Sequence, residues 1–231
     1  AKSIFLTNIS HDLKTPMNSI FGMTELIKNT ELTEKQYDFL NIISRSSENL
    51  LGIINDILTI PRIENGDLFL KKKAFKVEDI MISVAGIVSY QAELKGIEVI
   101  ESLKVKDDLV IYGDSARLNQ ILINLVYNSI KYTEEGSVEI LFEVISESKN
   151  SVDIRFSVID TGIGMSDELI EVLETSFVKN DSDILNKYGN GGLGLMISSQ
   201  LVKLFGGELI IDSKLNSGTK FSFDLRFKKG T

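Results

Sequence analysis

The chain has a single histidine, His11, which stands in the run Ser10-His-Asp-Leu-Lys-Thr-Pro-Met-Asn18. An imidazole beside an acid, here Asp12, is a potential nucleophile or proton acceptor near neutral pH. His11 follows Ile9, an apolar-face residue of the predicted first helix, by two residues, about 200° round that helix. We therefore expect the imidazole to be exposed. A lone histidine is more often structural than catalytic, so its role depends on the rest of the chain.

A second group of residues has the chemistry of a base-binding site. The run Asp160-Thr-Gly-Ile-Gly-Met165 directly follows an apolar strand. A carboxylate at a strand end can accept a hydrogen bond from an exocyclic amine, and two glycines, Gly162 and Gly164, allow the backbone to pass close to a ring. The same residues are equally compatible with an ordinary glycine turn.

The predicted helix from Ser115 to Tyr132 has one apolar face and one polar face. Two amide oxygens four residues apart can bind a hard cation, and a lysine three residues further on can pair with phosphate. The alternative is a solvated helix face, the commonest fate of such residues. The polar face carries Arg117, Gln120, Asn124, Asn128 and Lys131.

The glycine-rich run Gly189-Asn-Gly-Gly-Leu-Gly194 has the G-x-G-x-x-G spacing of a dinucleotide-binding loop. That loop requires a buried strand directly before its first glycine, whereas residues 179–188 are mostly polar. Rossmann-type binding is therefore a minor alternative, and no Walker A sequence occurs. A glycine-rich lid that opens onto a helix still suits phosphates, because free backbone N–H groups and the helix dipole favour an anion.

The first sixty residues predict two helices with coiled-coil seams, because apolar positions recur at alternating spacings of four and three. Thr33 and Gln36 form a capping box for the second helix, and Pro16 should bend the first. Two helices cannot bury both seams, so we expect a homodimer that forms a four-helix bundle; the alternative is a hairpin packed on the rest of the chain. The seam positions are Ile9, Leu13, Pro16, Ile20, Met23 and Ile27, then Leu40, Ile43, Ser47, Leu50, Ile54 and Ile57.

After Pro61 and Gly66, which mark a hinge, the pattern changes to alternating strands and helices. We expect strands at 68–75, 109–112, 137–144, 151–159, 208–212 and 219–227. Helices are predicted at 77–94 and 115–132, and one more follows a polar loop after residue 160. The fold class is therefore two domains: an all-α hairpin at 1–66, then an α+β sandwich at 67–231 with helices on one face of a mixed sheet.

Composition limits the classes of function. The 231 residues have a net charge of −8, which argues against nucleic acid as a partner. The chain has no cysteine, which excludes disulfides, thiolate metal sites and cysteine nucleophiles. No apolar run approaches the roughly 20 residues of a membrane helix, so we expect no membrane segment in this piece of a longer protein.

In this order and spacing, the motifs resemble the transmitter core of bacterial sensor histidine kinases, from Phe5 to Phe227. Residues 10–18 resemble the H box, with Lys14 where arginine is commoner. Residues 124–131 resemble the N box, and residues 160–165 and 191–195 resemble the two glycine boxes. Gly206-Gly207, Ser213 and residues 218–221 are similar to the closing strands of the family. The resemblance implies a dimerisation and phosphotransfer hairpin followed by a Bergerat or GHKL-like ATP-binding domain.

The resemblance also implies a role for each matched residue. His11 would accept the phosphoryl group, Asp12 would orient the imidazole and raise its nucleophilicity, and Thr15 would position a water for dephosphorylation of a partner. Asp160 would bind the adenine amino group, and Asn128 would ligate Mg²⁺. Tyr132 would pack on the base, with a plain core tyrosine as the alternative. The implied ATP-binding residues are Asn124, Asn128, Lys131, Tyr132, Asp160, Gly162, Gly164, Gly191, Gly192, Leu193, Gly194 and Thr219.

The implied function is ATP-dependent autophosphorylation on His11 and transfer to an aspartate of a response-regulator receiver domain. The fragment would be cytoplasmic and its parent membrane-anchored. Two departures fall in the lid: residues 173–177 keep only the last phenylalanine of a Phe-x-Pro-Phe box, and Asn190-Gly191 replaces a Gly-Thr pair. They support an alternative, a nucleotide-binding switch that acts mainly as a response-regulator phosphatase. A gyrase-like or mismatch-repair ATPase is a further alternative, but such proteins lack the histidine-bearing hairpin.

Overall fold

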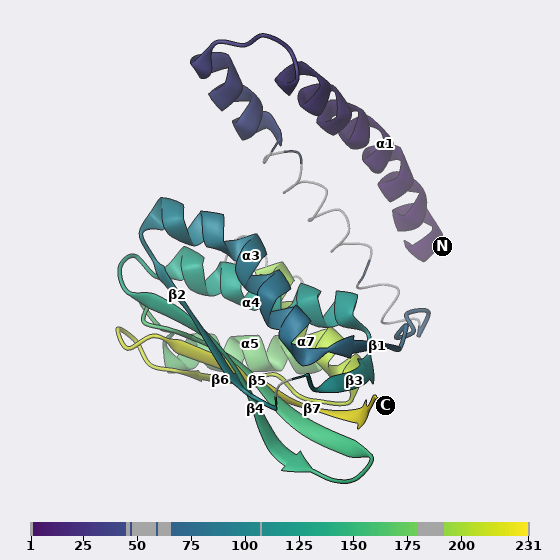
Figure 1. Cartoon of the computed structure of the whole chain (residues 1–231), viewed down its shortest axis with the longest axis vertical. Helices are drawn as coiled ribbons and strands as arrows, with labels where there is room; N and C mark the ends of the chain where they lie inside the picture. The colour runs from purple at the N-terminus through teal and green to yellow at the C-terminus, as the bar shows by residue number, and fades with distance from the viewer. Residues whose placement is uncertain are drawn as a thin grey trace. The chain divides into compact units, whose positions relative to one another are not determined.

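The computed structural model describes residues 2–44, 47, 59, 66–106, 108–179 and 192–230. The chain divides into two compact units, Ala1–Leu68 and Phe69–Thr231 (Figure 1). Among the described residues, none of the helices combines the length and the apolar character needed to cross a membrane.

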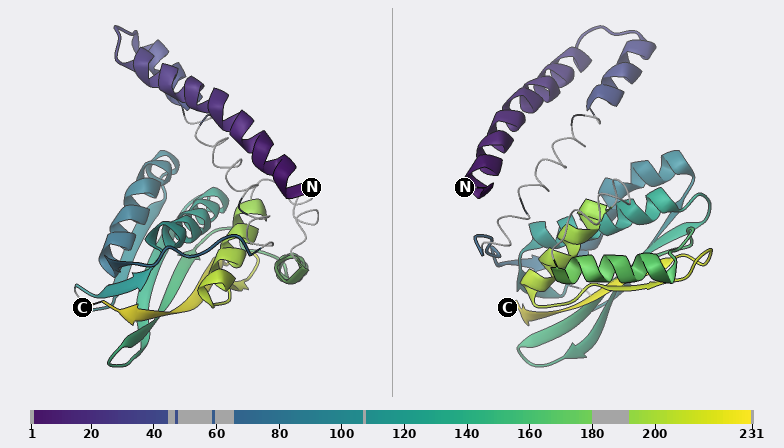
Figure 2. Two further views of the ribbon diagram at one scale, coloured as in Figure 1. Left: turned by 90° about the vertical axis from the view of Figure 1, so that its right-hand side faces the viewer. Right: turned by 180° about the vertical axis from the view of Figure 1, so that it is seen from behind.

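The first unit contains a helical hairpin. Helix α1 spans Lys2–Lys28 and continues through Pro16, and residues 34–44 form a helix that runs back beside it (Figure 2). The predicted capping box is present: the Thr33 N–H donates to Gln36 Oε1 over 2.9 Å, and the Gln36 N–H donates to Thr33 Oγ1 over 3.3 Å. The bend at Pro16 stays a prediction. The seam residues Leu50, Ile54 and Ile57 lie outside the described residues, as do the side chains of Ile9 and Leu13.

The predicted seam is only partly buried in the single chain. Leu40 and Ser47 are buried, together with Met17 and Thr24, which are not seam positions. The other described seam residues are exposed: Pro16, Ile20 by 44%, Met23 by 58%, Ile27 by 41% and Ile43 by 45%. A row of half-exposed apolar side chains is what one hairpin of a larger helical bundle presents to its other helices.

The second unit is an α+β sandwich, as predicted. Its described strands form a seven-stranded mixed sheet in the order β1-β3-β7-β5-β4-β2, with β6 also paired to β7. Strands β2 and β4 run parallel, and the other described pairs are antiparallel. The helices cover one face of this sheet (Figure 1). The elements are β1 Lys73–Lys76, α3 Val77–Lys95, β2 Glu98–Lys104, β3 Val110–Gly113, α4 Ser115–Tyr132, β4 Ser137–Glu147, β5 Ser151–Asp160, α5 Asp167–Lys179, α7 Gly192–Phe205, β6 Ile210–Ser213 and β7 Thr219–Lys229.

The main differences from the sequence predictions concern strand β1, strand β2 and the helices after β5. Strand β1 begins at Lys73 rather than Leu68, because its partner β3 offers only four residues for pairing. Strand β2 was not predicted; it lies at the end of the strand order, and its exposed and covered residues do not alternate strictly, so the period-two signal is weak. Two helices, α5 and α7, stand where the sequence predicted one.

The core of the second unit lies between the sheet and the helices. The rings of Phe156 and Phe142 have centroids 4.8 Å apart, and those of Phe156 and Phe223 are 5.2 Å apart. Burial of each such ring stabilises the fold by about 1.5–3 kcal/mol. Alternate residues of β5 face this core, and Asp160 is the next core-facing position after Val158. The two-residue period of the strand therefore places the Asp160 carboxylate at the edge of the core.

Candidate functional site

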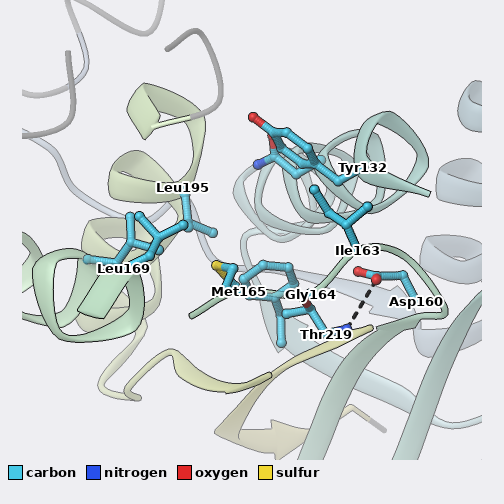
Figure 3. Close-up of a pocket in the computed structure, with 11 residues that line it drawn as sticks. Tyr132, Asp160, Ile163, Gly164, Met165, Leu169, Leu195 and Thr219 are labelled. Carbon is cyan, nitrogen blue, oxygen red and sulfur yellow. Dashed lines mark hydrogen bonds between the residues drawn. The ribbon is translucent and has the colours of Figure 1, made fainter. Parts of the chain in front are cut away.

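A cavity of about 200 Å³ lies beside the C-terminal part of α4 (Figure 3). Its polar lining consists of Asn128, Tyr132, Asp160 and Thr219. The rest of its lining is glycine and apolar side chains from the loop after β5, from α5, from α7 and from β7. A cavity of this kind suits a flat apolar ring that carries few polar groups. The remaining lining residues are Ile163, Gly164, Met165, Leu169, Leu173, Leu195 and Phe221.

Asp160 is the charged group of this cavity, and its side chain is only 6% exposed. Its Oδ1 accepts a hydrogen bond from the Thr219 N–H over 3.1 Å (Figure 3). The same oxygen accepts one from the Gly162 N–H over 3.0 Å. Its Oδ2 accepts one from the Ser129 hydroxyl over 2.9 Å. A buried carboxylate is costly unless it is hydrogen-bonded. These donors occupy both acceptor positions of Oδ1 and one of Oδ2, which leaves a single position for a ligand.

The glycines of this region pack against the protein's own backbone. A Cβ atom on Gly162 would lie 2.4 Å from the Tyr132 carbonyl oxygen, and one on Gly164 would lie 2.0 Å from that of Lys214. Gly164 also has a φ of 65°, a conformation that side-chain-bearing residues rarely adopt. These two close contacts are with the chain itself, so the approach of this backbone to a ring stays a prediction.

Helix α4 positions the polar residues of the predicted N box. Asn124 Nδ2 donates to the Gly194 carbonyl over 3.4 Å, which joins α4 to the first turn of α7. Asn128, one turn later, lines the cavity. Lys131 Nζ lies 4.9 Å from the centroid of the Tyr132 ring, within cation–π distance. Tyr132 itself is 40% exposed, so it is not a core tyrosine.

The C-terminal end of α4 is held by Lys95, the last residue of α3. Lys95 Nζ donates to the carbonyl oxygens of Ile130, Lys131 and Thr133, each over 2.8 Å. A cation at a helix C-terminus is favourable because it meets the negative end of the helix dipole. On the cavity side, the Ile163 N–H donates to the Tyr132 carbonyl over 3.1 Å. The backbone around Tyr132 is therefore fixed by two elements.

Other predicted site residues are placed only in part. His11 and Asp12 belong to α1, but their side chains lie outside the described part of the chain, and Thr15 of α1 is exposed. Gly192 and Leu193 begin α7 with Gly194, and Gly191 lies outside the described residues. The structure thus brings five of the predicted residues around one cavity, and Gly162 joins them through Asp160. The five are Asn128, Tyr132, Asp160, Gly164 and Thr219.

Sequence reasoning missed two serines of this site. Ser129 donates to Asp160, and Ser213 Oγ lies 2.8 Å from Thr219 Oγ1 and accepts the Met165 N–H over 2.9 Å. A signal for Ser129 was present: it occupies a small polar position on the otherwise apolar, sheet-facing side of α4. Ser213 was matched only to the closing strands of the family and not assigned to the site, because its partners are five or more residues away in sequence.

The donor set around Asn128 fits Mg²⁺ that arrives with a nucleotide. Mg²⁺ prefers oxygen ligands and commonly uses one or two protein side chains together with substrate phosphates. Asn128 offers an amide oxygen at the cavity. The described residues contain no group of three or more histidine, cysteine, aspartate or glutamate side chains that would bind a metal by themselves.

Two family models match the chain. Residues 113–229 match the model of the histidine kinase-, DNA gyrase B- and HSP90-like ATPases. Residues 1–66 match the model of the His Kinase A (phospho-acceptor) domain. The second match distinguishes the chain from gyrase-like members of the ATPase family.

Curated relatives and a solved structure agree with these matches. The sensor histidine kinase GacS of Pseudomonas protegens is 39% identical over 228 residues, which are 99% of this chain and 25% of GacS. The histidine-protein kinase BarA of Escherichia coli is 40% identical over 226 residues, 97% of this chain and 24% of BarA. This chain therefore spans about a quarter of the length of these relatives.

The crystal structure of full-length ShkA in complex with AMPPNP superimposes with a TM-score of 0.73 and 32% identity, and covers 98% of this chain and 46% of ShkA. The family models place a phospho-acceptor domain before an ATPase domain, and the alignments with GacS, BarA and ShkA span both. The chain belongs to the sensor histidine kinases and corresponds to their transmitter core.

Proposed function

We propose that this chain binds Mg·ATP in the cavity beside Asp160, phosphorylates itself on His11 and passes the phosphoryl group to an aspartate of a response-regulator receiver domain. One observation carries the nucleotide assignment. The buried Asp160 carboxylate has one acceptor position left, on Oδ2, in the wall of a largely apolar cavity. An aromatic ring with an exocyclic amine, such as adenine, fits both features.

Different residues around the cavity would bind different parts of the nucleotide. Asp160 would bind the amino group, and Tyr132, which lines the cavity, would pack on the base. Asn128 would hold Mg²⁺, with Asn124 beside it, and Mg²⁺ would offset the charge of the phosphates. Lys131 would leave its contact with Tyr132 to pair with phosphate. The backbone N–H groups of residues 192–194, at the start of α7, would face the phosphates together with that of Gly191, which lies outside the described residues.

His11 would act as the nucleophile. Its imidazole nitrogen attacks the γ-phosphorus in line, a P–N bond forms as the bond to the ADP oxygen breaks, and ADP leaves. Asp12 would orient the imidazole and accept its other N–H. The P–N bond is reactive enough for the phosphoryl group to pass on to a carboxylate. The hinge predicted from the sequence at residues 61–66, of which 61–65 lie outside the described residues, would allow the second unit to approach the first.

We also propose that two chains pair through their hairpins. Apolar side chains of α1 and of residues 34–44 are exposed in the single chain, and a four-helix bundle would bury them. In the longer parent, this dimer would act in the cytoplasm below a membrane-anchored sensor. The exposed side chains that support this proposal are Ile20, Met23, Leu26, Ile27, Phe39, Ile42 and Ile43.

The test is incubation of the chain with Mg²⁺ and γ-labelled ATP. The wild type should acquire label that is acid-labile and base-stable, as expected of phosphohistidine. His11→Gln should acquire none and should still bind ADP with wild-type affinity. Label that persists in His11→Gln would contradict the assignment of the phosphoacceptor.

A second candidate function is a nucleotide-binding switch that acts mainly as a response-regulator phosphatase. It rests on Thr15, which is exposed on α1 one turn after His11, and on the two lid departures in the sequence. Nucleotide binding by the wild type without any labelling would favour this candidate. A phosphorylated receiver would then lose its label faster with the wild type than with Thr15→Ala.

A further inference from the structure

We infer that Ser129 is a positioning residue that makes the cavity select a 6-amino purine over a 6-oxo purine, by determining which acceptor position of Asp160 remains for the ligand. The inference rests on the proposed nucleotide site. It concerns a residue that does not line the cavity and acts only through Asp160.

Ser129 lies behind the carboxylate. It follows Asn128 on α4, so its side chain is turned by about 100° from the cavity-facing amide. The residue is 1% exposed, and its hydroxyl donates to Asp160 Oδ2 over 2.9 Å. Its own carbonyl accepts the Thr133 hydroxyl over 2.7 Å, which holds this part of the helix in place. Ser129 is therefore a fixed donor with one partner.

Ser129 differs from the other two donors to Asp160 because it donates through its side chain. The donors to Oδ1 are backbone N–H groups of Gly162 and Thr219, which are present whatever the side chain. Among the described residues, the side-chain donor to Asp160 is Ser129. Its hydroxyl occupies the inner position of Oδ2 and leaves the other position to the cavity. That position can only accept, so it binds an amine and repels a carbonyl oxygen.

Removal of the hydroxyl would open a second acceptor position on a buried oxygen. A buried acceptor without a donor recruits water when there is room for it. Such a water can donate either to Asp160 or to a ligand carbonyl, unlike the Ser129 hydroxyl, whose hydrogen is committed to Asp160. The amine would lose its single defined partner, and a 6-oxo group would gain a donor.

The experiment compares the equilibrium binding of MgADP and MgIDP to the whole chain by calorimetry. The wild type should bind ADP more tightly than IDP. In Ser129→Ala the ratio of the IDP to the ADP dissociation constant should fall by about tenfold, the scale of one charge-assisted hydrogen bond. Ser129→Thr keeps the hydroxyl and should retain most of the wild-type ratio.

Ser157→Ala is the matched control. Ser157 is fully buried on β5, the strand that ends at Asp160, but it occupies the opposite face, and its Oγ has no hydrogen-bond partner in the described part of the chain. This variant also loses a serine Oγ atom, but it loses no hydrogen bond to Asp160. Its ratio of the IDP to the ADP dissociation constant should therefore equal that of the wild type.

The outcomes separate the inference from the proposed function. Equal weakening of ADP and IDP in Ser129→Ala, or an unchanged ratio, would show that Ser129 is only structural and would overturn the inference. A wild type that binds ADP and IDP equally would overturn it as well. A wild type that binds neither nucleotide would overturn the proposed nucleotide site itself.

Discussion

Asp114 Oδ2 accepts a hydrogen bond of 2.8 Å from the backbone N–H of Lys71. The other oxygen of the same carboxylate, Oδ1, accepts one of 3.1 Å from the Arg117 N–H and so caps the N-terminus of α4. One side chain that is 6% exposed therefore joins the segment leading into β1 to the helix that carries Asn124 and Asn128. A displacement of that segment would therefore act on the residue that caps the N-terminus of this helix.

Two substitutions of Asp114 should distinguish the effects of its two hydrogen bonds. Asp114→Asn keeps an oxygen for the helix cap, but its amide nitrogen cannot accept the Lys71 N–H. We expect the Lys71 amide to exchange with deuterium at least tenfold faster in this variant, with little change at α4. Asp114→Ala loses both contacts and should destabilise the chain by about 1–2 kcal/mol. Equal exchange of the Lys71 amide in wild type and Asp114→Asn would show that the contact is unimportant in solution.

Gly218→Ala should disturb the site through Asp160. Gly218 has a φ of 85°, and a Cβ there would lie 1.9 Å from the Asp160 carbonyl oxygen. The backbone must shift, which moves the adjacent Thr219 N–H away from Asp160 Oδ1. We expect a loss of about 2 kcal/mol or more in the free energy of unfolding, measured with urea, and a weaker affinity for ADP.

Gly206→Ala is the control for that variant. Gly206 has a comparable φ of 91°, but no atom lies within 4 Å of its added Cβ. It should lose about 1 kcal/mol in the free energy of unfolding and bind ADP normally. If both variants bind ADP alike, the contact between Gly218 and Asp160 does not shape the site.

Stability should depend on pH through Glu147 of β4. Hydrogen bonds from Lys106 and Lys229 lower the pKa of Glu147 from 4.5 to about 2. Because the pKa is lower in the folded chain, the carboxylate stabilises the fold above about pH 4.5, and this contribution is lost as the pH falls from 4.5 towards 2. The difference in urea midpoint between wild type and Glu147→Gln should therefore shrink over that range. It should also be smaller at high salt, since the lysines reach solvent; a pH-independent difference would refute this account.

Asn128→Asp should impair the use of Mg·ATP. The substitution adds a negative charge where Asn128 offers a neutral amide oxygen to the cavity. We expect autophosphorylation to fall by about 10- to 100-fold, the scale of a disturbed metal environment, with an altered Mg²⁺ dependence of ADP binding. Asn150→Asp makes the same charge change at an exposed turn and should behave as wild type. Wild-type turnover in Asn128→Asp would remove Asn128 from the site.

Local patterns made much of the fold predictable. Helix α4 has the predicted bounds, and β5 begins where expected and extends one residue further, to Asp160. A helical stripe and a two-residue alternation are read within one element, so they do not depend on its neighbours. Strand β2 was missed because it lies at the sheet edge with much of its surface exposed, and β1 was predicted too long because its length depends on β3.

The sequence by itself determined most of the elements in their order, the motifs and the family that they indicate. Only the tertiary structure decided which donors Asp160 meets and which of its acceptor positions is left for a ligand. Pairing of β5 with β7 puts the Thr219 N–H beside Oδ1, and packing of α4 on the sheet puts Ser129 beside Oδ2. Those donors are 59 and 31 residues from Asp160 along the chain. Such contacts depend on strand register and helix packing, which no local pattern of residues specifies.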